Sequence, residues 1–183
     1  MPYFQPDLTY ASYRDVAPEA LRARGIEVLL LDIDNTLAPY EQLDPDAHIA
    51  AWLSAMESAG IRTAFLSNNH RERVTRFNQT LGRPAVYDAG KPIARKGRKL
   101  MRELGGDKKN TAMMGDQVFT DVWTARALGV TAILVPPIRD KRNALTRFKR
   151  FLERGVLRRY HKRHPDAPDV REGSSISEEL KDL

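Results

Sequence analysis

Short apolar runs alternate along most of the chain with longer segments of mixed apolar and polar residues. The runs predict five buried strands, over residues 27–33, 61–66, 85–87, 111–114 and 130–135. Apolar residues at helical spacing predict helices over residues 46–59, 69–81, 93–104 and 118–128, each followed by glycine. This alternation predicts an α/β fold, a doubly wound parallel sheet of about five strands within a three-layer sandwich.

The pattern divides the chain into three parts. Residues 1–140 are predicted to form the main α/β domain, with the first 26 residues as a lead-in that packs on the core. Residues 141–164 are predicted to be a basic helical extension, with Leu145, Phe148 and Leu152 on one stripe. Residues 165–183 are polar and contain two prolines, which predicts a disordered tail.

Composition excludes several classes of protein. The 183 residues include no cysteine, so disulfides, thiolate zinc sites and cysteine nucleophiles are excluded. No apolar run approaches the ~20 residues of a membrane-spanning helix, and the N-terminus lacks the features of a secretory signal. The default expectation is a cytoplasmic protein, with a peripheral position at the inner face of the membrane as a further option.

The net charge of +6 is unevenly distributed. Between residues 139 and 164, only Asp140 and Glu153 oppose a block of basic residues: Arg139, Lys141, Arg142, Arg147, Lys149, Arg150, Arg154, Arg158, Arg159, Lys162 and Arg163. Such a block is typical of a protein with a polyanionic partner, a membrane surface or a nucleic acid. A solvated helix face, or a face that packs on the domain itself, explains it equally well.

The strongest chemical signal is the segment Asp32-Ile33-Asp34-Asn35-Thr36, which directly follows the first predicted strand. Two carboxylates this close repel each other unless a cation binds beside them. A simple turn is the alternative interpretation, because Asp, Asn and Thr all favour turns. The position of two acids against a buried strand favours a functional site.

Two further motifs follow later strands. In Ser67-Asn68-Asn69, a hydroxyl, an amide and the backbone N–H groups of a following helix are suited to holding a phosphate, although a helix cap has the same composition. Lys91 lies at the start of a predicted helix, where a positive charge is unfavourable and therefore notable.

Gly115-Asp116 and then Asp121 form the last motif, after the predicted strand 111–114. Carboxylates at a strand end suit an oxygen-preferring cation such as Mg²⁺. The alternative is a helix cap at Asp116 and an exposed acid at Asp121. Ligands of parallel sheets bind beyond the carboxyl ends of the strands, so the four motifs together predict one cleft.

The order of these motifs resembles that of the haloacid dehalogenase superfamily, and within it subfamily IIIA and the YqeG-type phosphatases. The resemblance rests on DIDNTL, FLSNN, AGKP, MGDQVFTDV and TAILVPPI and covers roughly residues 6–160. It implies that Asp32 is the nucleophile and Asp34 the general acid/base. It also implies that Asp32, the Asp34 backbone carbonyl and Asp116 hold Mg²⁺, with Asp121 in support.

The same resemblance implies roles for the remaining motif residues. Ser67 and Asn68 would hold the transferring phosphoryl group, and Lys91 would neutralise its charge and that of the nucleophile. Thr36 is assigned to substrate binding or to setting the loop.

The spacing leaves no room for an inserted cap domain, so the fold is expected to be capless or minimally capped. An open site suits a large substrate. Relatives of the YqeG-type family include phosphatidylglycerophosphate phosphatases, which favours an anionic lipid and a function in phospholipid metabolism.

Three alternatives stay open at this stage. One is a phosphatase of nucleic-acid termini, for which Phe148, Phe151 and Tyr160 are the candidate stacking residues. Another is a non-catalytic scaffold that binds through its basic helix. The third is a response-regulator receiver domain, which is disfavoured because the last strand ends in Pro136-Pro137 with no lysine.

Overall fold

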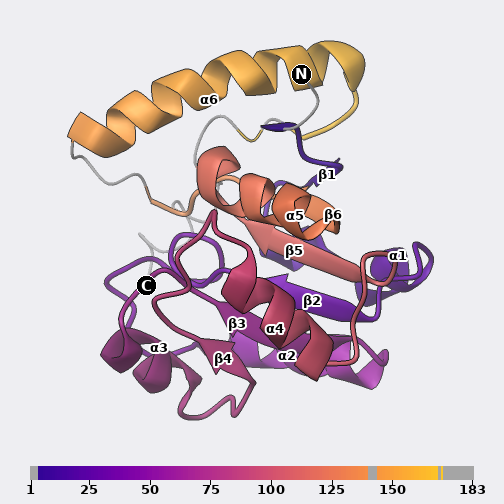
Figure 1. Cartoon of the computed structure of the whole chain (residues 1–183), viewed down its shortest axis with the longest axis vertical. Coiled ribbons are helices and arrows are strands. Elements are labelled where there is room, and N and C mark those ends of the chain that lie inside the picture. Colours follow the sequence, from indigo (N-terminus) through magenta and orange to yellow (C-terminus); the bar gives the residue numbers. More distant parts are fainter. Residues whose placement is uncertain (1–3, 140–143, 169, 171–183) are drawn as a thin grey trace.

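The computed structural model describes residues 4–139, 144–168 and 170, except for the side chains of residues 144–151. These residues form a sheet in which all neighbouring strands are parallel. In the order β1-β6-β5-β2-β3-β4 (Figure 1), the strands are β1 (Leu8–Thr9), β6 (Thr131–Leu134), β5 (Thr111–Gly115), β2 (Val28–Leu31), β3 (Arg62–Leu66) and β4 (Ala85–Val86). The predicted parallel α/β fold is confirmed.

Helices cover both faces of the sheet, which confirms the predicted three layers (Figure 1). One face carries α1 (Pro18–Arg22), α2 (Ala47–Ser58) and α3 (Arg71–Asn78), preceded by the short helix η2 (Tyr13–Asp15). The other face carries α4 (Arg95–Glu103), η3 (Val118–Val122) and α5 (Trp123–Leu128). The long helix α6 (Ala144–Arg163) lies beyond α5 and contacts η3.

β2 shows why the strands read as continuous apolar runs. Its side chains alternate between the two faces, so Leu29 and Leu31 pack in the cluster beneath α1–α3. Val28 and Leu30 pack in the cluster beneath α4 and α5. All four are fully buried, because helices cover the sheet on both sides.

The sheet has one strand more than the five predicted. β1 belongs to the lead-in, and it pairs with β6. The N–H groups of Asp7 and Tyr10 donate to the carbonyl oxygens of Ala132 and Leu134 at 2.9 and 3.2 Å. Two residues are too few to produce a periodic pattern, so this strand is visible only through its tertiary partner.

The helices predicted between the strands match the observed ones within two residues at each end, except for two. The helix predicted over residues 69–81 is limited to Arg71–Asn78, because residues 67–70 form the polar turn after β3. The helix predicted over residues 118–128 begins as a π-helix, η3, in which the N–H of Val122 donates to the carbonyl oxygen of Gln117 at 3.2 Å. π-Helical turns are rare and occur frequently at functional sites.

The connections at the carboxyl end of the sheet are short. Residues 32–46 join β2 to α2 and residues 67–70 join β3 to α3, so the described residues contain no large cap, as predicted. None of the helices in the described part of the chain is long and apolar enough to cross a membrane.

The C-terminal predictions fall partly outside the described residues. Residues 141–143 of the predicted basic helix lie outside them, as do the side chains of Leu145 and Phe148. Most of the predicted tail, residues 169 and 171–183, also lies outside them. Val170 is described, and it is buried in the cluster on the α4 and α5 side of the sheet.

Substitution of Leu30 tests the central position of β2. We expect Leu30→Ala to lower the free energy of unfolding by about 3 kcal/mol, because it removes a fully buried side chain and leaves a cavity. The matched control is Leu43→Ala, where the leucine is 42% exposed, with an expected loss below about 0.5 kcal/mol. Urea unfolding followed by circular dichroism measures both, and equal losses would contradict this account of the core.

Candidate active site

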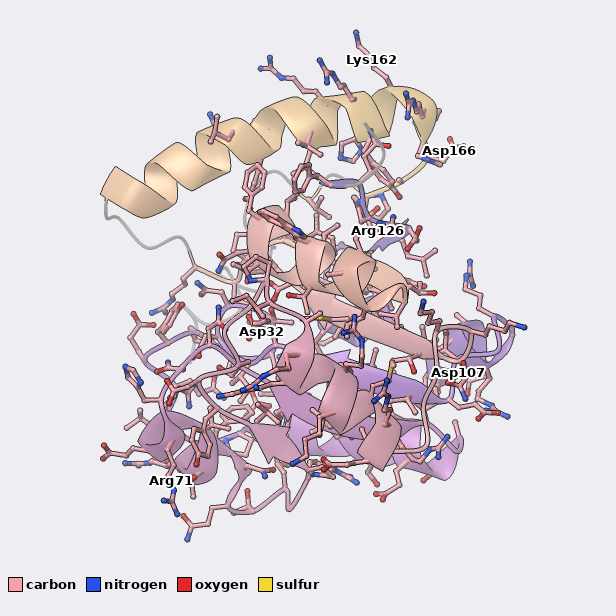
Figure 2. All side chains as sticks on the ribbon, in the orientation of Figure 1. Asp32, Arg71, Asp107, Arg126, Lys162 and Asp166 are labelled. Carbon is pink, nitrogen blue, oxygen red and sulfur yellow. The ribbon has the colours of Figure 1, made fainter. Side chains whose placement is uncertain are left out.

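The sequence motifs converge at the carboxyl edge of the sheet. Asp32 directly follows β2, Ser67 follows β3 and Asp116 follows β5, while Lys91 lies in the loop between β4 and α4. Figure 2 labels Asp32 at this edge. Because all the strands are parallel, their polar ends meet on one side, as the sequence predicts.

A tight turn follows the two acids of the first motif. Asp34 forms an isolated parallel bridge with Ala38, and the N–H of Asn35 donates to the Ala38 carbonyl oxygen at 2.7 Å. Asn35 has a φ of 63°, a left-handed conformation that asparagine adopts more readily than most residues. The chain therefore turns away from the strand direction between Ile33 and Ala38.

The ammonium group of Lys91 lies between two carboxylates. Its Nζ is 2.8 Å from Asp32 Oδ1 and 2.7 Å from Asp121 Oδ1, and the Lys91 side chain is only 2% exposed. Burial lowers the pKa of Lys91, but the charges of Asp121 and Asp32 raise it more, so the lysine stays protonated. Such a pair of charge-assisted hydrogen bonds fixes the amine in place.

Asp32 experiences opposing effects. Burial raises its pKa, Lys91 lowers it, and the neighbouring Asp121 and Asp116 raise it again, with a net pKa of about 8. Without a cation beside it, Asp32 therefore holds a proton near neutral pH.

Three buried acids lie close enough together to hold a metal ion. Each of Asp32, Asp116 and Asp121 offers a carboxylate oxygen, and these atoms all lie within 4.8 Å of one another. Against three negative charges, the Lys91 ammonium leaves an excess of two, which a divalent cation cancels. An all-oxygen donor set of this kind fits Mg²⁺. The residues present therefore fit the metal that the sequence predicts.

The carboxylate of Asp34 is held by Asn69, which belongs to the Ser67-Asn68-Asn69 motif, and by Arg73, which the sequence did not single out. Arg73 Nε donates to Oδ1 and Asn69 Nδ2 donates to Oδ2, both at 3.1 Å. Arg73 also donates to the Leu43 carbonyl oxygen at 3.0 Å, and its guanidinium carbon lies 5.1 Å from the centre of the Phe77 ring. Arg73 thus orients Asp34, the predicted acid/base. In the sequence, Arg73 looks like an ordinary surface residue of a helix.

The side chains of Ser67 and Asn68 make different kinds of contact. Ser67 is buried, lines the pocket and accepts a hydrogen bond from the Asn69 N–H at 3.0 Å. The Asn68 side chain instead forms two hydrogen bonds with the backbone of Lys91. It accepts from the Lys91 N–H at 2.7 Å and donates to the Lys91 carbonyl oxygen at 3.0 Å. Asn68 therefore fixes the loop that carries Lys91.

A pocket of about 320 Å³ opens above the acids. Its lining contains the predicted Asp32, Asp34, Ser67, Asn68 and Lys91, together with Tyr40, Asn69, Gln117 and Thr120. Burial, and then the charges of Asp34, Asp32 and Asp116, raise the pKa of Tyr40 to about 12, so its phenol faces the acids as a neutral group. Thr36 is buried within the turn and does not line this pocket.

Gly115, the last residue of β5, makes room for Asp121. A Cβ atom added at Gly115 would overlap the carboxylate carbon of Asp121. Asp121 lies on η3 and is 1% exposed, and its Oδ2 accepts from the Gln117 N–H at 3.1 Å. Gly115 is thus required because Asp121 packs against its α-carbon.

Comparison with known proteins places this fold and site in a family. Residues 7–129 match the model of haloacid dehalogenase-like hydrolases. The chain belongs to this family. It is also 32% identical, over 155 residues, to a Bacillus subtilis (strain 168) protein named probable phosphatase YqeG; the match covers 85% of this chain and 90% of that protein. The predicted membership of the superfamily is confirmed.

Solved structures share the fold. An uncharacterized protein from Listeria monocytogenes serotype 4b has a TM-score of 0.51 and 18% identity, covering 64% of this chain and 85% of its own. A hypothetical protein from Xanthomonas campestris has a TM-score of 0.51 and 20% identity, covering 68% and 72%. These likenesses support the α/β architecture.

Gly115→Ala tests the packing of Asp121 on β5. We expect the added methyl group to displace Asp121, lowering the free energy of unfolding by about 1–3 kcal/mol and weakening Mg²⁺ binding about tenfold or more. Gly155→Ala is the matched control, because no atom lies within 4 Å of a Cβ added there. Thermal unfolding and calorimetric titration with Mg²⁺ measure both variants; unchanged Mg²⁺ binding in Gly115→Ala would contradict the assignment.

The raised pKa of Asp32 makes stability and metal binding depend on pH. Since the folded pKa lies above the unfolded value of 3.8, metal-free folded protein binds the extra proton, and its stability should fall as pH rises toward about 8. Mg²⁺ must displace that proton, so its apparent dissociation constant should rise about tenfold for each pH unit below 8. Titration calorimetry between about pH 6 and 9 measures this slope. A flat profile, or one unchanged in Asp32→Asn, would rule out Asp32 as the titrating ligand.

Proposed function

We propose that this protein is a Mg²⁺-dependent phosphomonoester hydrolase that works through an aspartyl-phosphate on Asp32. The observation that carries the proposal is the buried cluster of Asp32, Lys91 and Asp121, of which Asp32 and Lys91 line an open pocket. The named Bacillus subtilis relative is a probable phosphatase, which supports the same reaction class.

The first half of the reaction forms a bond between an Asp32 carboxylate oxygen and phosphorus. The bond from phosphorus to the ester oxygen breaks, and Asp34 gives its proton to that leaving oxygen, so an alcohol departs. In the second half, Asp34 takes a proton from water while the water oxygen attacks phosphorus. The acyl phosphate bond breaks, which releases phosphate and restores the Asp32 carboxylate.

The remaining residues would position the phosphoryl group and balance the charges around it. Lys91 lies where it would neutralise the nucleophile and the transferring phosphoryl group, and the Ser67 hydroxyl faces the same pocket. Asp32, Asp116, Asp121 and the Asp34 backbone carbonyl would hold Mg²⁺, which would supply charge stabilisation at the phosphoryl oxygens. We assign Asn68 and Thr36 to shaping the loops, with Asn68 still adjacent to the phosphate position.

For the substrate, we infer a large phosphorylated molecule, with phosphatidylglycerophosphate the best candidate. No large cap covers the pocket in the described residues, so the substrate itself must help to exclude water. The outer face of α6 is basic and suits a polyanion; its exposed basic residues include Arg154, Arg158, Arg159 and Lys162. Figure 2 shows Lys162 pointing away from the domain.

The exposure of Leu152 favours a lipid surface as this polyanion. Leu152 is 44% exposed, and it lines a shallow groove along α6 together with Arg159 and Lys162. Basic residues next to an exposed apolar side chain are typical of interfacial helices, and each contributes ~1 kcal/mol near an anionic surface. The proposed position is therefore peripheral, at the cytoplasmic face of a membrane.

Nucleic-acid termini are the weaker substrate. Tyr160, one of the three candidate stacking residues, is 3% exposed and stacks on His164, so it does not offer a free ring to a base. The side chains of Phe148 and Phe151 lie outside the described residues.

A substrate panel tests the proposal. Purified protein is assayed with Mg²⁺ on p-nitrophenyl phosphate, on phosphatidylglycerophosphate in vesicles, and on 5′- and 3′-phosphorylated oligonucleotides. We expect turnover of the small ester and preferential turnover of the lipid, each reduced at least about 10³-fold in Asp32→Asn, because that variant lacks the nucleophile.

A variant of the outer face separates mechanism from substrate. Arg158→Gln combined with Arg159→Gln should lower turnover of the vesicle substrate about tenfold and leave turnover of p-nitrophenyl phosphate unchanged. Preference for oligonucleotides would keep the mechanism and reassign the substrate. Absence of Mg²⁺-dependent turnover, or turnover retained in Asp32→Asn, would contradict the mechanism and favour a scaffold.

A further inference from the structure

A carboxylate from the C-terminal helix is buried against the active-site segment. Glu153 lies on α6, opposite the basic outer face, and is only 3% exposed. It lies outside residues 7–129, which the family model matches. A glutamate is rarely this buried unless its charge is satisfied, so its contacts require an explanation.

One partner of Glu153 is the backbone at the start of η3. Glu153 Oε1 accepts a hydrogen bond from the backbone N–H of Val118 at 2.9 Å, and both groups are buried. The first N–H groups of a helical turn have no partner within the turn, and a carboxylate is a favourable acceptor for them. The bond therefore anchors η3 to α6.

η3 is the segment that completes the site. It carries Asp121, which contacts Lys91, and Thr120, which lines the pocket with the preceding Gln117. The Gln117 N–H donates to Asp121 itself at 3.1 Å, and the next N–H, that of Val118, donates to Glu153. Two successive peptide groups are thus held by two acids, one from within the site and one from α6.

Other contacts between α6 and the domain include apolar packing and a hydrogen bond at the end of the helix, where Arg163 Nη1 donates to Gln5 Oε1 at 3.3 Å. Leu157 and Tyr160, on the inner face of α6, are buried at 4% and 3% exposure. Apolar packing holds the helix on the domain without fixing the register of η3, because it has no direction. The hydrogen bond from Val118 is directional, so it holds η3 at one position against α6.

We propose that Glu153 is a positioning residue, which holds η3 so that Asp121 keeps its place between Lys91 and the metal position. α6 is then a structural part of the active site. The metal aspect of this inference rests on the proposed function, whereas the anchoring of η3 does not.

Two substitutions at Glu153 separate its hydrogen bond from its volume. Glu153→Gln keeps an oxygen that accepts from Val118, and Glu153→Leu fills similar space without an acceptor. Leu157→Ala is the control for general loosening of α6, because it removes buried apolar contacts and no polar partner.

Two measurements are made on the full chain: Mg²⁺ affinity by titration calorimetry, and hydrogen exchange of the Val118 and Asp121 amides by NMR without metal. In Glu153→Leu we expect Mg²⁺ affinity to fall about 10–100-fold, the range for residues that support metal ligands, and both amides to exchange faster. Glu153→Gln should stay within about threefold of wild type. Leu157→Ala should melt at a lower temperature with Mg²⁺ affinity unchanged.

Other outcomes overturn the proposal. These are wild-type Mg²⁺ affinity in Glu153→Leu, or an equal loss of affinity in Leu157→Ala. If the wild-type chain itself binds no Mg²⁺, the proposed function is wrong. Hydrogen exchange in the metal-free protein then decides by itself whether Glu153 anchors η3. Faster exchange of the two amides in Glu153→Leu but not in Glu153→Gln then supports the anchoring of η3, and equal exchange in all variants overturns it.

Discussion

The ammonium group of Lys91, buried between the carboxylates of Asp32 and Asp121, is the interaction around which the site is built. None of these charges is stable in the interior alone, because an unpaired buried charge is costly. With Asp116 beside them, negative charge remains in excess, and either a proton on Asp32 or a divalent cation compensates it. The same balance that allows burial therefore makes Asp32 responsive to a metal.

The parallel sheet brings these charges together. Asp32 and Asp116 follow adjacent strands, β2 and β5, and reach the same edge without any long loop. Lys91 and Asp121 come from loops and turns that need local fixing: Asn68 clasps the Lys91 backbone, and the close approach of Asp121 to β5 requires Gly115. Rigid strands thus place the acids, and short polar contacts align their partners.

α6 extends this arrangement beyond the segment that defines the family. Its inner face packs on the domain and reaches η3 through Glu153, and its outer face exposes a row of arginine and lysine side chains. The sequence left open whether this helix meets a membrane, a nucleic acid or its own domain. In the structure, one face of the helix packs on the domain and the other faces solvent. An open pocket and a basic helix on one domain are the two features on which the proposed anionic substrate rests.

The sequence alone determined the alternation of strands and helices, because strands buried on both faces are continuous apolar runs and a glycine follows each segment with a helical pattern between them. It also placed Asp32, Ser67 and Asp116 at strand ends. Tertiary structure decided what local pattern does not encode. β1 needs β6 to be recognised as a strand, and Arg73 and Glu153 look like ordinary helix residues until Asp34 and Val118 are found beside them. Each depends on a partner distant in the sequence, and such contacts leave no periodic signal along the chain.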